Sequence, residues 1–196
     1  MNWDERYACD DYIYGKEPND FLRSCAGKIP AGKVLTLAEG EGRNAVYLAA
    51  QGYEVTAVDN SSVALEKARQ LAAERNVSIT TIHADLGDFT IEADEWEGII
   101  SCFCHLPVTL RASLHQAVVR GLKPGGMLVF EGFSKEQLSY GTGGPQSLDL
   151  LMKLEELQQE LVGLKFVHAV QVEREVREGL GHTGLAAVVQ LLGIKP

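Results

Sequence analysis

Residues 34–45 of this 196-residue chain read VLTLAEGEGRNA. The first four residues are apolar or β-branched and predict a short buried strand. Gly40 and Gly42 follow at once, and both allow a positive φ and a close approach of a ligand to the backbone. Arg43 then opens an apolar segment with helical spacing, which Gly52 closes. The order of strand, glycine turn and helix predicts a βαβ unit whose helix N-terminus faces a ligand.

The segments on either side repeat this alternation of strand and helix. Short β-rich runs predict further strands at 55–58, 79–82, 99–103 and 127–130. Ser61 or Ser62 is expected to cap a helix that carries Leu65 and Leu71, and Pro107 is expected to open a helix that runs to about residue 120. Strands that alternate with helices favour an α/β fold with a mainly parallel sheet.

The last third of the chain has a different pattern. Residues 166–170 and 185–189 are both β-rich, and the polar, glycine-containing stretch between them is too short for a crossover helix. Two strands joined in this way must be antiparallel. The sequence shows no internal repeat and no linker, so we expect a single domain over residues 1–196.

The composition narrows the classes of function. The net charge is −9, which disfavours binding to a phosphate backbone, and no partner of that kind is expected. No apolar run approaches the length that spans a bilayer, and the first residues are polar and acidic, unlike a signal peptide. We therefore expect a cytoplasmic protein without a membrane partner.

Cysteine usage does not indicate a metal site. The chain has four cysteines, and none is separated from another by two residues. Cys102 and Cys104 lie two apart in a predicted strand, so their side chains are expected to share one face. A metal site would need further cysteine or histidine ligands, and no metal is expected.

Two aspartates that follow later strands add to the indication of a ligand site at the glycine turn. Asp59 ends the second predicted strand, about 20 residues beyond the turn, where a carboxylate accepts hydrogen bonds from the hydroxyls of a ribose. Asp85 follows the third strand, and a carboxylate with adjacent backbone groups can bind an adenine edge. The glycine pattern alone also fits a nicotinamide dinucleotide site or a plain turn between a strand and a helix.

These features together resemble the class I S-adenosylmethionine-dependent methyltransferases. The order and spacing agree from about residue 33 to 132, through residues 34–44, 57–59, 84–86, 99–103 and the turn at 122–126. The segment with Trp3, Arg6, Tyr7, Tyr14 and residues 15–19 resembles the tellurite-resistance and thiol-type small-molecule subgroup. The resemblance implies a three-layer Rossmann-like sandwich, with a seven-stranded, mostly parallel sheet whose last strand is antiparallel.

The resemblance also implies a cofactor, S-adenosyl-L-methionine, whose product is S-adenosyl-L-homocysteine. The residues that it assigns to the cofactor are Glu39, Gly40, Gly42, Arg43, Asp59, Asn60, Ser61, Asp85, Leu86, Cys102 and Phe103. Two positions depart from the family, which has an acidic residue at the position of Thr36 and a glycine at that of Ala38. We hypothesise that the Glu39 carboxylate takes over pairing with the cofactor's ammonium group.

Candidates for the acceptor site follow the carboxyl ends of the strands, where the sites of parallel sheets lie. His105 follows the fourth strand and can remove a proton at neutral pH. Glu131 is a second candidate, although a charge at a strand end is often solvated. Arg174, Arg177 and His182 lie on or beside the terminal turn, and they can bind an anionic acceptor by charge-assisted hydrogen bonds or form an exposed hairpin.

We therefore expect three parts in the one domain. Residues 1–32 form an N-terminal cover segment, which carries Trp3, Tyr7, Tyr12 and Tyr14. Residues 33–132 form the cofactor-binding core. Residues 133–196 hold a glycine-rich lid at 139–145, a helix and the hairpin. The expected function is methyl transfer to a small molecule, such as a thiol or a chalcogen or metalloid oxyanion. The alternatives are a non-catalytic sensor of S-adenosylmethionine and an NAD-dependent oxidoreductase. The sequence does not indicate an oligomeric state.

Overall fold

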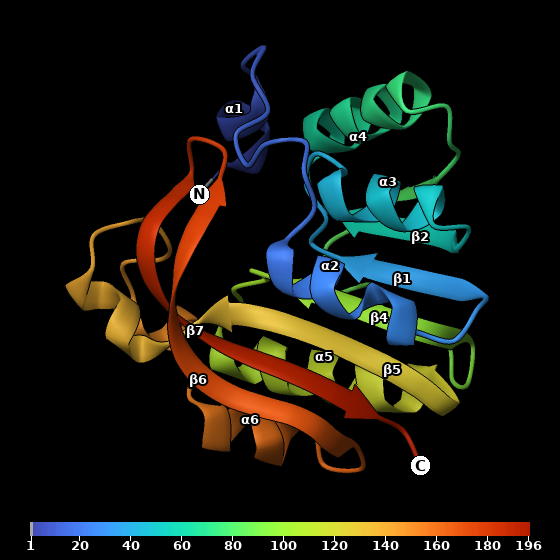
Figure 1. Ribbon diagram of the computed structural model, residues 1–196, viewed down its shortest axis with the longest axis vertical. Coiled ribbons are helices and arrows are strands. Elements are labelled where there is room, and N and C mark those ends of the chain that lie inside the picture. The colour runs from blue at the N-terminus through green and yellow to red at the C-terminus, as the bar shows by residue number, and fades with distance from the viewer. Residues whose placement is uncertain (1) are drawn as a thin grey trace.

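Seven strands form one sheet, in the order β3-β2-β1-β4-β5-β7-β6, in the computed structural model of residues 2–196 (Figure 1). Strands β1 to β5 pair in parallel, and β7 is antiparallel to both β5 and β6. This architecture confirms the expected fold. The strands are β1 (Lys33–Leu37), β2 (Glu54–Asp59), β3 (Thr80–His83), β4 (Trp96–Cys102), β5 (Leu122–Phe133), β6 (Lys165–Glu178) and β7 (His182–Ile194).

Helices cover both faces of the sheet. Figure 1 shows α2 and α3 on one side of the sheet and α5 and α6 on the other. The helices are α1 (Trp3–Tyr7), α2 (Asp20–Cys25), α3 (Arg43–Ala50), α4 (Ser62–Glu74), α5 (Val108–Gly121) and α6 (Leu154–Glu160). Three short 3-10 helices are η1 (Ala26–Lys28), η2 (Lys135–Ser139) and η3 (Leu148–Leu150). Ser61 is the N-cap of α4; the sequence allows Ser61 or Ser62 in this role.

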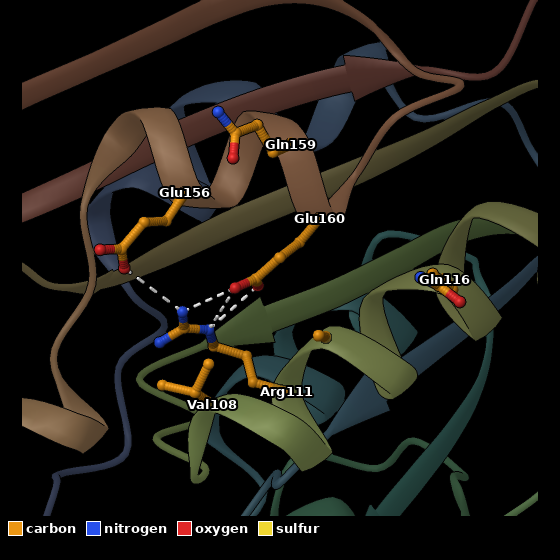
Figure 2. Close-up of a pocket in the computed structure, with 7 residues that line it drawn as sticks. Val108, Arg111, Gln116, Glu156, Gln159 and Glu160 are labelled. Carbon is orange, nitrogen blue, oxygen red and sulfur yellow. Dashed lines mark hydrogen bonds and ion pairs between the residues drawn. The ribbon is translucent and has the colours of Figure 1, made fainter.

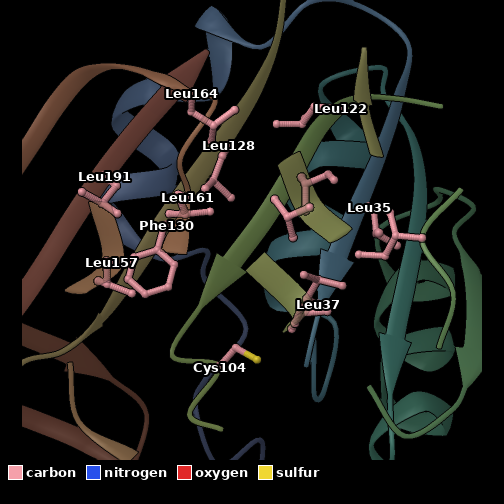
Figure 3. Packing of buried hydrophobic residues seen from close by; sticks show 14 of the residues in the cluster. Leu35, Leu37, Cys104, Leu122, Leu128, Phe130, Leu157, Leu161, Leu164 and Leu191 are labelled. Atoms are coloured by element: carbon pink, nitrogen blue, oxygen red, sulfur yellow. The ribbon is translucent and has the colours of Figure 1, made fainter. Parts of the chain in front are cut away.

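The hydrophobic core is divided between the two faces by strand alternation. Leu35 and Leu128 belong to the larger cluster of buried residues, which also contains Leu157 of α6 and Phe130 (Figure 3). Their chain neighbours on the same strands pack on the opposite face with α2 and α3. Parallel strands buried on both faces read as continuous apolar runs, which is why the run at 34–37 marked a strand so clearly.

The terminal hairpin is much longer than the sequence indicated. β6 and β7 pair continuously from Lys165 with Ile194 to Glu178 with His182, apart from a bulge near Phe166. Most of the polar stretch that we expected to connect two short strands is therefore strand. From Glu173 to Glu178 every second side chain turns inward, but charged residues lie on both faces, so the polarity of this stretch obscured the strand.

Two local expectations need correction. Cys102 and Cys104 do not share a face: Cys102 packs on the α2 and α3 side, and Cys104 on the α5 and α6 side. The reason is that β4 ends at Cys102 and Phe103 takes a left-handed φ of 54°, which breaks the alternation. Residues 122–126, expected to be a turn before the fifth strand, already belong to β5, with Gly125 at a φ of 81°.

The segment expected to be a lid lies against the terminal hairpin and β5. The Gln137 side chain donates to the Thr142 hydroxyl and to the Gly143 carbonyl, both at 3.0 Å. The Thr142 hydroxyl donates in turn to the Leu185 carbonyl on β7 at 2.7 Å. A side chain at Gly144 would come within 2.7 Å of the Phe133 ring. In residues 2–196, no helix has the length and apolar character needed to cross a membrane.

Candidate cofactor and acceptor site

The glycine loop between β1 and α3 has a backbone that few residues other than glycine adopt. Gly40 and Gly42 have φ values of 66° and 93°, and Ala38 has 48°. A Cβ at Gly42 would lie 2.7 Å from the Cα of Ala68 on α4, so glycine is required there for both conformation and space. The positive φ of Ala38 also explains why glycine is usual at this position in the family that the sequence resembles.

Glu39 lies inside this loop and caps α3. Its Oε1 accepts hydrogen bonds from the backbone amides of Asn44 at 3.0 Å and Ala45 at 2.9 Å. Burial raises the pKa of the Glu39 carboxyl to about 7, although the amides at the helix N-terminus favour the charged form. The carboxyl group is thus poised to change its charge near neutral pH when a cationic group approaches.

Asp59 joins the carboxyl ends of β1 and β2. Its Oδ2 accepts from the Gly40 amide at 2.8 Å, and its Oδ1 accepts from the Ser61 amide at 2.9 Å. Burial raises the pKa of this carboxyl group, and the two amides oppose that shift. The structure therefore brings Glu39, Gly40, Asp59 and Ser61 together at the ends of adjacent parallel strands, where the sequence placed the cofactor.

The other residues expected near an adenine ring lie less deeply. Asn60 and Asp85 are exposed, and the Asp85 Oδ1 accepts from the Gly87 amide at 2.7 Å, which stabilises a turn. Leu86 is buried, and its side chain belongs to the core on the α5 side. The structure leaves Asp85 accessible to a ligand, whereas Leu86 serves packing.

Arg43 belongs to a buried network of charges behind the glycine loop. Its Nη2 lies 2.8 Å from the Glu178 Oε2, and its Nη1 has no partner among the described residues. Asn19 donates to Glu131 at 2.8 Å and to Glu178 at 2.9 Å. Arg174 pairs with Glu131, so two arginines balance two carboxylates. Glu131 is fully buried, which corrects the alternative of a solvated charge at a strand end.

Electrostatics in this network favour the charged form of Glu178. Burial opposes that form, but the nearby His182 ring and Arg43 guanidinium outweigh it and lower the pKa of Glu178 to about 2. Cys102 lies in the same region, and burial raises the pKa of its thiol well above the usual value. Cys102 is therefore a neutral, buried neighbour of Arg43.

Aromatic rings line the carboxyl ends of β4 and β5. The Phe103 ring lies 4.6 Å from the ring of Phe133 and 4.7 Å from that of His182, measured between centroids. Tyr14 from the cover segment lies 4.6 Å from His182, and His105 stacks on Phe133 at 5.4 Å. Phe103 carries a left-handed φ, which is uncommon for a bulky residue and typical of functional sites.

The two candidate histidines differ in their contacts. The His105 Nδ1 lies 2.9 Å from the Leu150 carbonyl, and its Nε2 is buried without a partner among the described residues. Burial lowers the pKa of His105 to about 4. The His182 Nδ1 lies 3.5 Å from Glu178, and burial lowers the pKa of His182 as well. Both rings are therefore neutral at neutral pH. Together with Tyr14, Phe103 and Phe133 they form what we call the aromatic wall.

Arg177 does not join these histidines, which corrects the expectation of a shared basic site. Its side chain is 82% exposed and lies 3.7 Å from Glu175. The physical reason is the two-residue period of β6, which places Arg177 on the opposite face from Glu178, the pairing partner of His182. Arg174 does point inward, but Glu131 and Glu178 occupy its guanidinium.

Sequence reasoning missed three residues that the structure places in or beside the site. They are Asn19, Phe133 and Glu178. Phe133 ends the apolar β5, and Glu178 continues an alternation with Arg174 and Val176. Asn19 has no comparable signal, because its side chain acts as the N-cap of α2 and reaches residues more than 100 positions away.

A surface cavity of about 300 Å³ lies between α5 and α6, away from the strand ends. Figure 2 shows Arg111 of α5 pointing toward Glu156 and Glu160 of α6. The Arg111 Nη2 lies 2.6 Å from Glu160, which also accepts from His115 at 2.7 Å. Burial opposes charge on Glu160, but His115 and Arg111 outweigh it and lower its pKa to about 2. This cluster fastens α6 to α5.

The comparisons with known proteins agree with this geometry. Residues 34–126 match the family model described as "Methyltransferase domain". A 2-heptyl-1-hydroxyquinolin-4(1H)-one methyltransferase from Mycobacteroides abscessus is 32% identical over 117 residues, which is 58% of this chain and 52% of the relative. The chain thus spans about half the length of this relative.

Solved structures agree with the fold over nearly the whole chain. The structure of the N-methyltransferase NodS from Bradyrhizobium japonicum, in complex with S-adenosyl-L-homocysteine, has a TM-score of 0.71 at 18% identity and covers 99% of this chain and 96% of NodS. TehB from Haemophilus influenzae has a TM-score of 0.73 at 20% identity and covers 90% of this chain and 62% of TehB. The chain therefore shares the fold of these solved structures, and residues 34–126 are similar to the methyltransferase-domain family.

Proposed function

We propose that this chain transfers a methyl group from S-adenosylmethionine to the S–H or O–H group of a small molecule, with a thiol as the preferred acceptor. The observation that carries the proposal is the buried, unpartnered Nε2 of His105 within the aromatic wall. Because the Leu150 carbonyl can only accept, Nδ1 carries the proton of the neutral ring, and Nε2 presents a lone pair.

The chemistry follows from this arrangement. Bound S-adenosylmethionine supplies a methyl group on a positively charged sulfur. The aromatic wall of Phe103, Phe133 and Tyr14 excludes water and favours a cationic centre. The acceptor is held by hydrogen bonding to Nε2 of His105. Its proton becomes strongly acidic as the bond to the methyl group forms, so even a histidine of low pKa can take it.

The electrostatics of the hairpin favour a neutral acceptor over a preformed oxyanion. Arg177 is exposed on the far face of β6, and the carboxylates of Glu131 and Glu178 offset Arg174 and Arg43. An oxyanion acceptor, as the resemblance to the tellurite-resistance subgroup implies, would meet two neutral histidines. We therefore place this chain nearer to the thiol-type members of that subgroup.

The cofactor residues are proposed as a group at the strand ends. Asp59 is assigned to the ribose, Asn60 and Asp85 to the adenine, and the glycine loop with Glu39 to the methionine part of the cofactor. Arg43, Cys102 and Phe103 lie beneath or beside the reactive centre. His105 is assigned to the acceptor, and His182 lies beside it in the aromatic wall.

Two measurements test this function. S-Adenosylhomocysteine should raise the melting temperature and NAD should not, because a ligand that binds only the folded state stabilises it by RT ln(1 + c/Kd), where c is the free ligand concentration. Methyl transfer should then be followed with small aromatic thiols, with hydroxyl compounds including 2-heptyl-1-hydroxyquinolin-4(1H)-one, and with selenite and tellurite. Turnover of the oxyanions alone would contradict the acceptor class. Stabilisation without turnover of any acceptor would support the sensor alternative instead.

A further inference from the structure

The first part of the cover segment, residues 3–16, lies on the two loops that form the proposed cofactor site. The Tyr7 side chain is buried, and a Cβ at Gly40 would come within 2.9 Å of its hydroxyl oxygen. Asp4 accepts a hydrogen bond from the Ser61 hydroxyl at 2.6 Å, at the loop between β2 and α4. Asp4 and Tyr7 thus hold this segment against both loops.

One lysine on α4 holds this segment in place. The Lys67 ammonium donates to the backbone carbonyls of Cys9 at 3.0 Å and Asp11 at 2.6 Å, and it lies 3.4 Å from that of Tyr7. Its nitrogen also lies 5.1 Å from the centre of the Tyr12 ring. A lysine with three carbonyl partners in one short segment fixes the path of that segment, because each contact needs the same bend of the backbone.

The same ammonium contacts the glycine loop. Its nitrogen lies 2.5 Å from Oε1 of Glu41, the residue between Gly40 and Gly42. The Lys67 side chain is 11% exposed and that of Glu41 is 2% exposed, so the ion pair is shielded from water. The other oxygen of Glu41 accepts from the amide of Tyr14 at 3.4 Å. Lys67 and Glu41 thus connect the cover segment and the loop under it.

We propose that Lys67 is a positioning residue that latches residues 3–16 over the bound cofactor and, through Glu41, couples opening of this segment to the glycine loop. The inference rests on the proposed cofactor site at that loop. Lys67 touches neither the loop's cofactor-facing amides nor the aromatic wall, so it acts through Glu41 and the carbonyls that it binds. Its loss should speed cofactor release before it affects the chemical step.

The structure offers a matched control on the same two elements. Lys16 also connects this part of the chain to α4, through an ion pair with Glu74 at 2.6 Å, but the two side chains are 38% and 52% exposed. Exposed pairs contribute little and are screened by salt. A latch function predicts different effects for the two lysines, whereas a general tethering of the segment predicts similar ones.

The experiment compares Lys67→Met and Lys16→Met in the full chain, with the dissociation rate of S-adenosylhomocysteine as the readout. We expect Lys67→Met to raise this rate at least about tenfold, because loss of a buried ion-pair partner favours the open state of the segment, and opening of such a segment often limits release. Lys16→Met should change it less than about twofold. Limited proteolysis should cut residues 3–16 of the Lys67→Met protein faster, even at saturating S-adenosylhomocysteine.

Each other outcome contradicts a defined part of the inference. Equal rates for the two variants, or an unchanged rate in Lys67→Met, overturn the latch. If Lys67→Met does not fold, Glu41→Gln replaces it, because that change keeps the carbonyl contacts of Lys67 and removes the charge in the glycine loop. An unchanged rate in Glu41→Gln overturns the coupling. If the unmodified chain does not bind S-adenosylhomocysteine, the cofactor site itself fails, and the latch fails with it.

Discussion

The Nδ1 of His105 lies 2.9 Å from the carbonyl oxygen of Leu150, which belongs to the last residue of η3. This contact determines which nitrogen of the neutral ring carries the proton. It leaves Nε2 as an acceptor in the aromatic wall, where no other described residue uses it. A backbone carbonyl between β5 and α6 therefore sets the chemistry of a side chain that follows β4.

Replacement of His105 by asparagine should lower kcat for a thiol or hydroxyl acceptor by about 100-fold or more, the usual contribution of a positioned proton acceptor. The KM for S-adenosylmethionine should not change. The matched control is His168→Asn. The His168 ring packs on Phe21 near the start of β6, so this variant should retain full activity.

The pH profile gives an independent check on the same ring. Because the pKa of His105 is lowered to about 4, the ring stays neutral from pH 8 down to about 5, and it loses function only as the pH falls through 4. A kcat, measured at saturating S-adenosylmethionine so that Glu39 titration of the free protein does not contribute, that fell with a midpoint near about 6.5 would contradict this assignment, since that is the pKa of an unperturbed histidine.

Binding of S-adenosylmethionine should release a proton near neutral pH. The pKa of Glu39 is about 7 in the free protein, so its carboxyl is about half protonated at pH 7. A cofactor ammonium beside it would lower that pKa and expel the proton. Calorimetry in buffers of different ionisation enthalpy should detect about half a proton at pH 7, and none in Glu39→Gln. Equal proton release by the two proteins would contradict the pairing of the Glu39 carboxylate with the cofactor's ammonium group.

Replacement of Glu178 by glutamine should destabilise the fold by about 3–5 kcal/mol, because it leaves the buried Arg43 without its counter-ion. The control on the same strand is Glu175→Gln, whose exposed pair with Arg177 should contribute less than about 1 kcal/mol. Urea denaturation at pH 7 measures both. Because the Glu178 pKa is lowered to about 2, its contribution should persist at pH 5 and disappear as the pH falls from about 4.5 toward 2.

Replacement of Gly42 by alanine should be far more costly than that of Gly52, although both glycines have nearly the same φ, 93° and 94°. A Cβ at Gly42 would lie 2.7 Å from Ala68, and one at Gly52 would meet nothing within 4 Å. We expect about 1 kcal/mol for Gly52→Ala from backbone strain alone, and about 3 kcal/mol or more for Gly42→Ala. Equal losses in urea denaturation would show that conformation, not space, requires Gly42.

Much of the fold was readable from local pattern. The strands at 34–37 and 55–58, the glycine turn and the capping of α4 by Ser61 depend on residues that are close in sequence, so periodicity and turn chemistry identify them. The antiparallel terminal pair followed from the length of its connection alone. These elements also bring the proposed cofactor residues together, because parallel strands end at one edge of the sheet.

The proposed acceptor side was less readable, because its side chains find partners far along the chain. Nothing near Glu131 indicates that Asn19, 112 positions earlier, donates a hydrogen bond to it, or that Arg174, 43 positions later, balances its charge. The outward direction of Arg177 depends on the extent of β6, which the polar composition of residues 171–178 obscured. The separation of Cys102 from Cys104 depends on one left-handed residue that no local signal marks.

The position of β7 between β5 and β6 has a consequence for how the chain folds. Two pairings in the sheet join distant segments: Val34 of β1 pairs with Gly98 of β4, and Met127 of β5 pairs with Ile194 of β7. Pairings of this kind form slowly, since the intervening chain must first be brought together. The β6–β7 hairpin is local near its turn, where Glu178 pairs with His182. The turn end of the hairpin should therefore gain protection from hydrogen exchange before β7 pairs with β5, and His182 should reach Phe103 only when that later pairing forms.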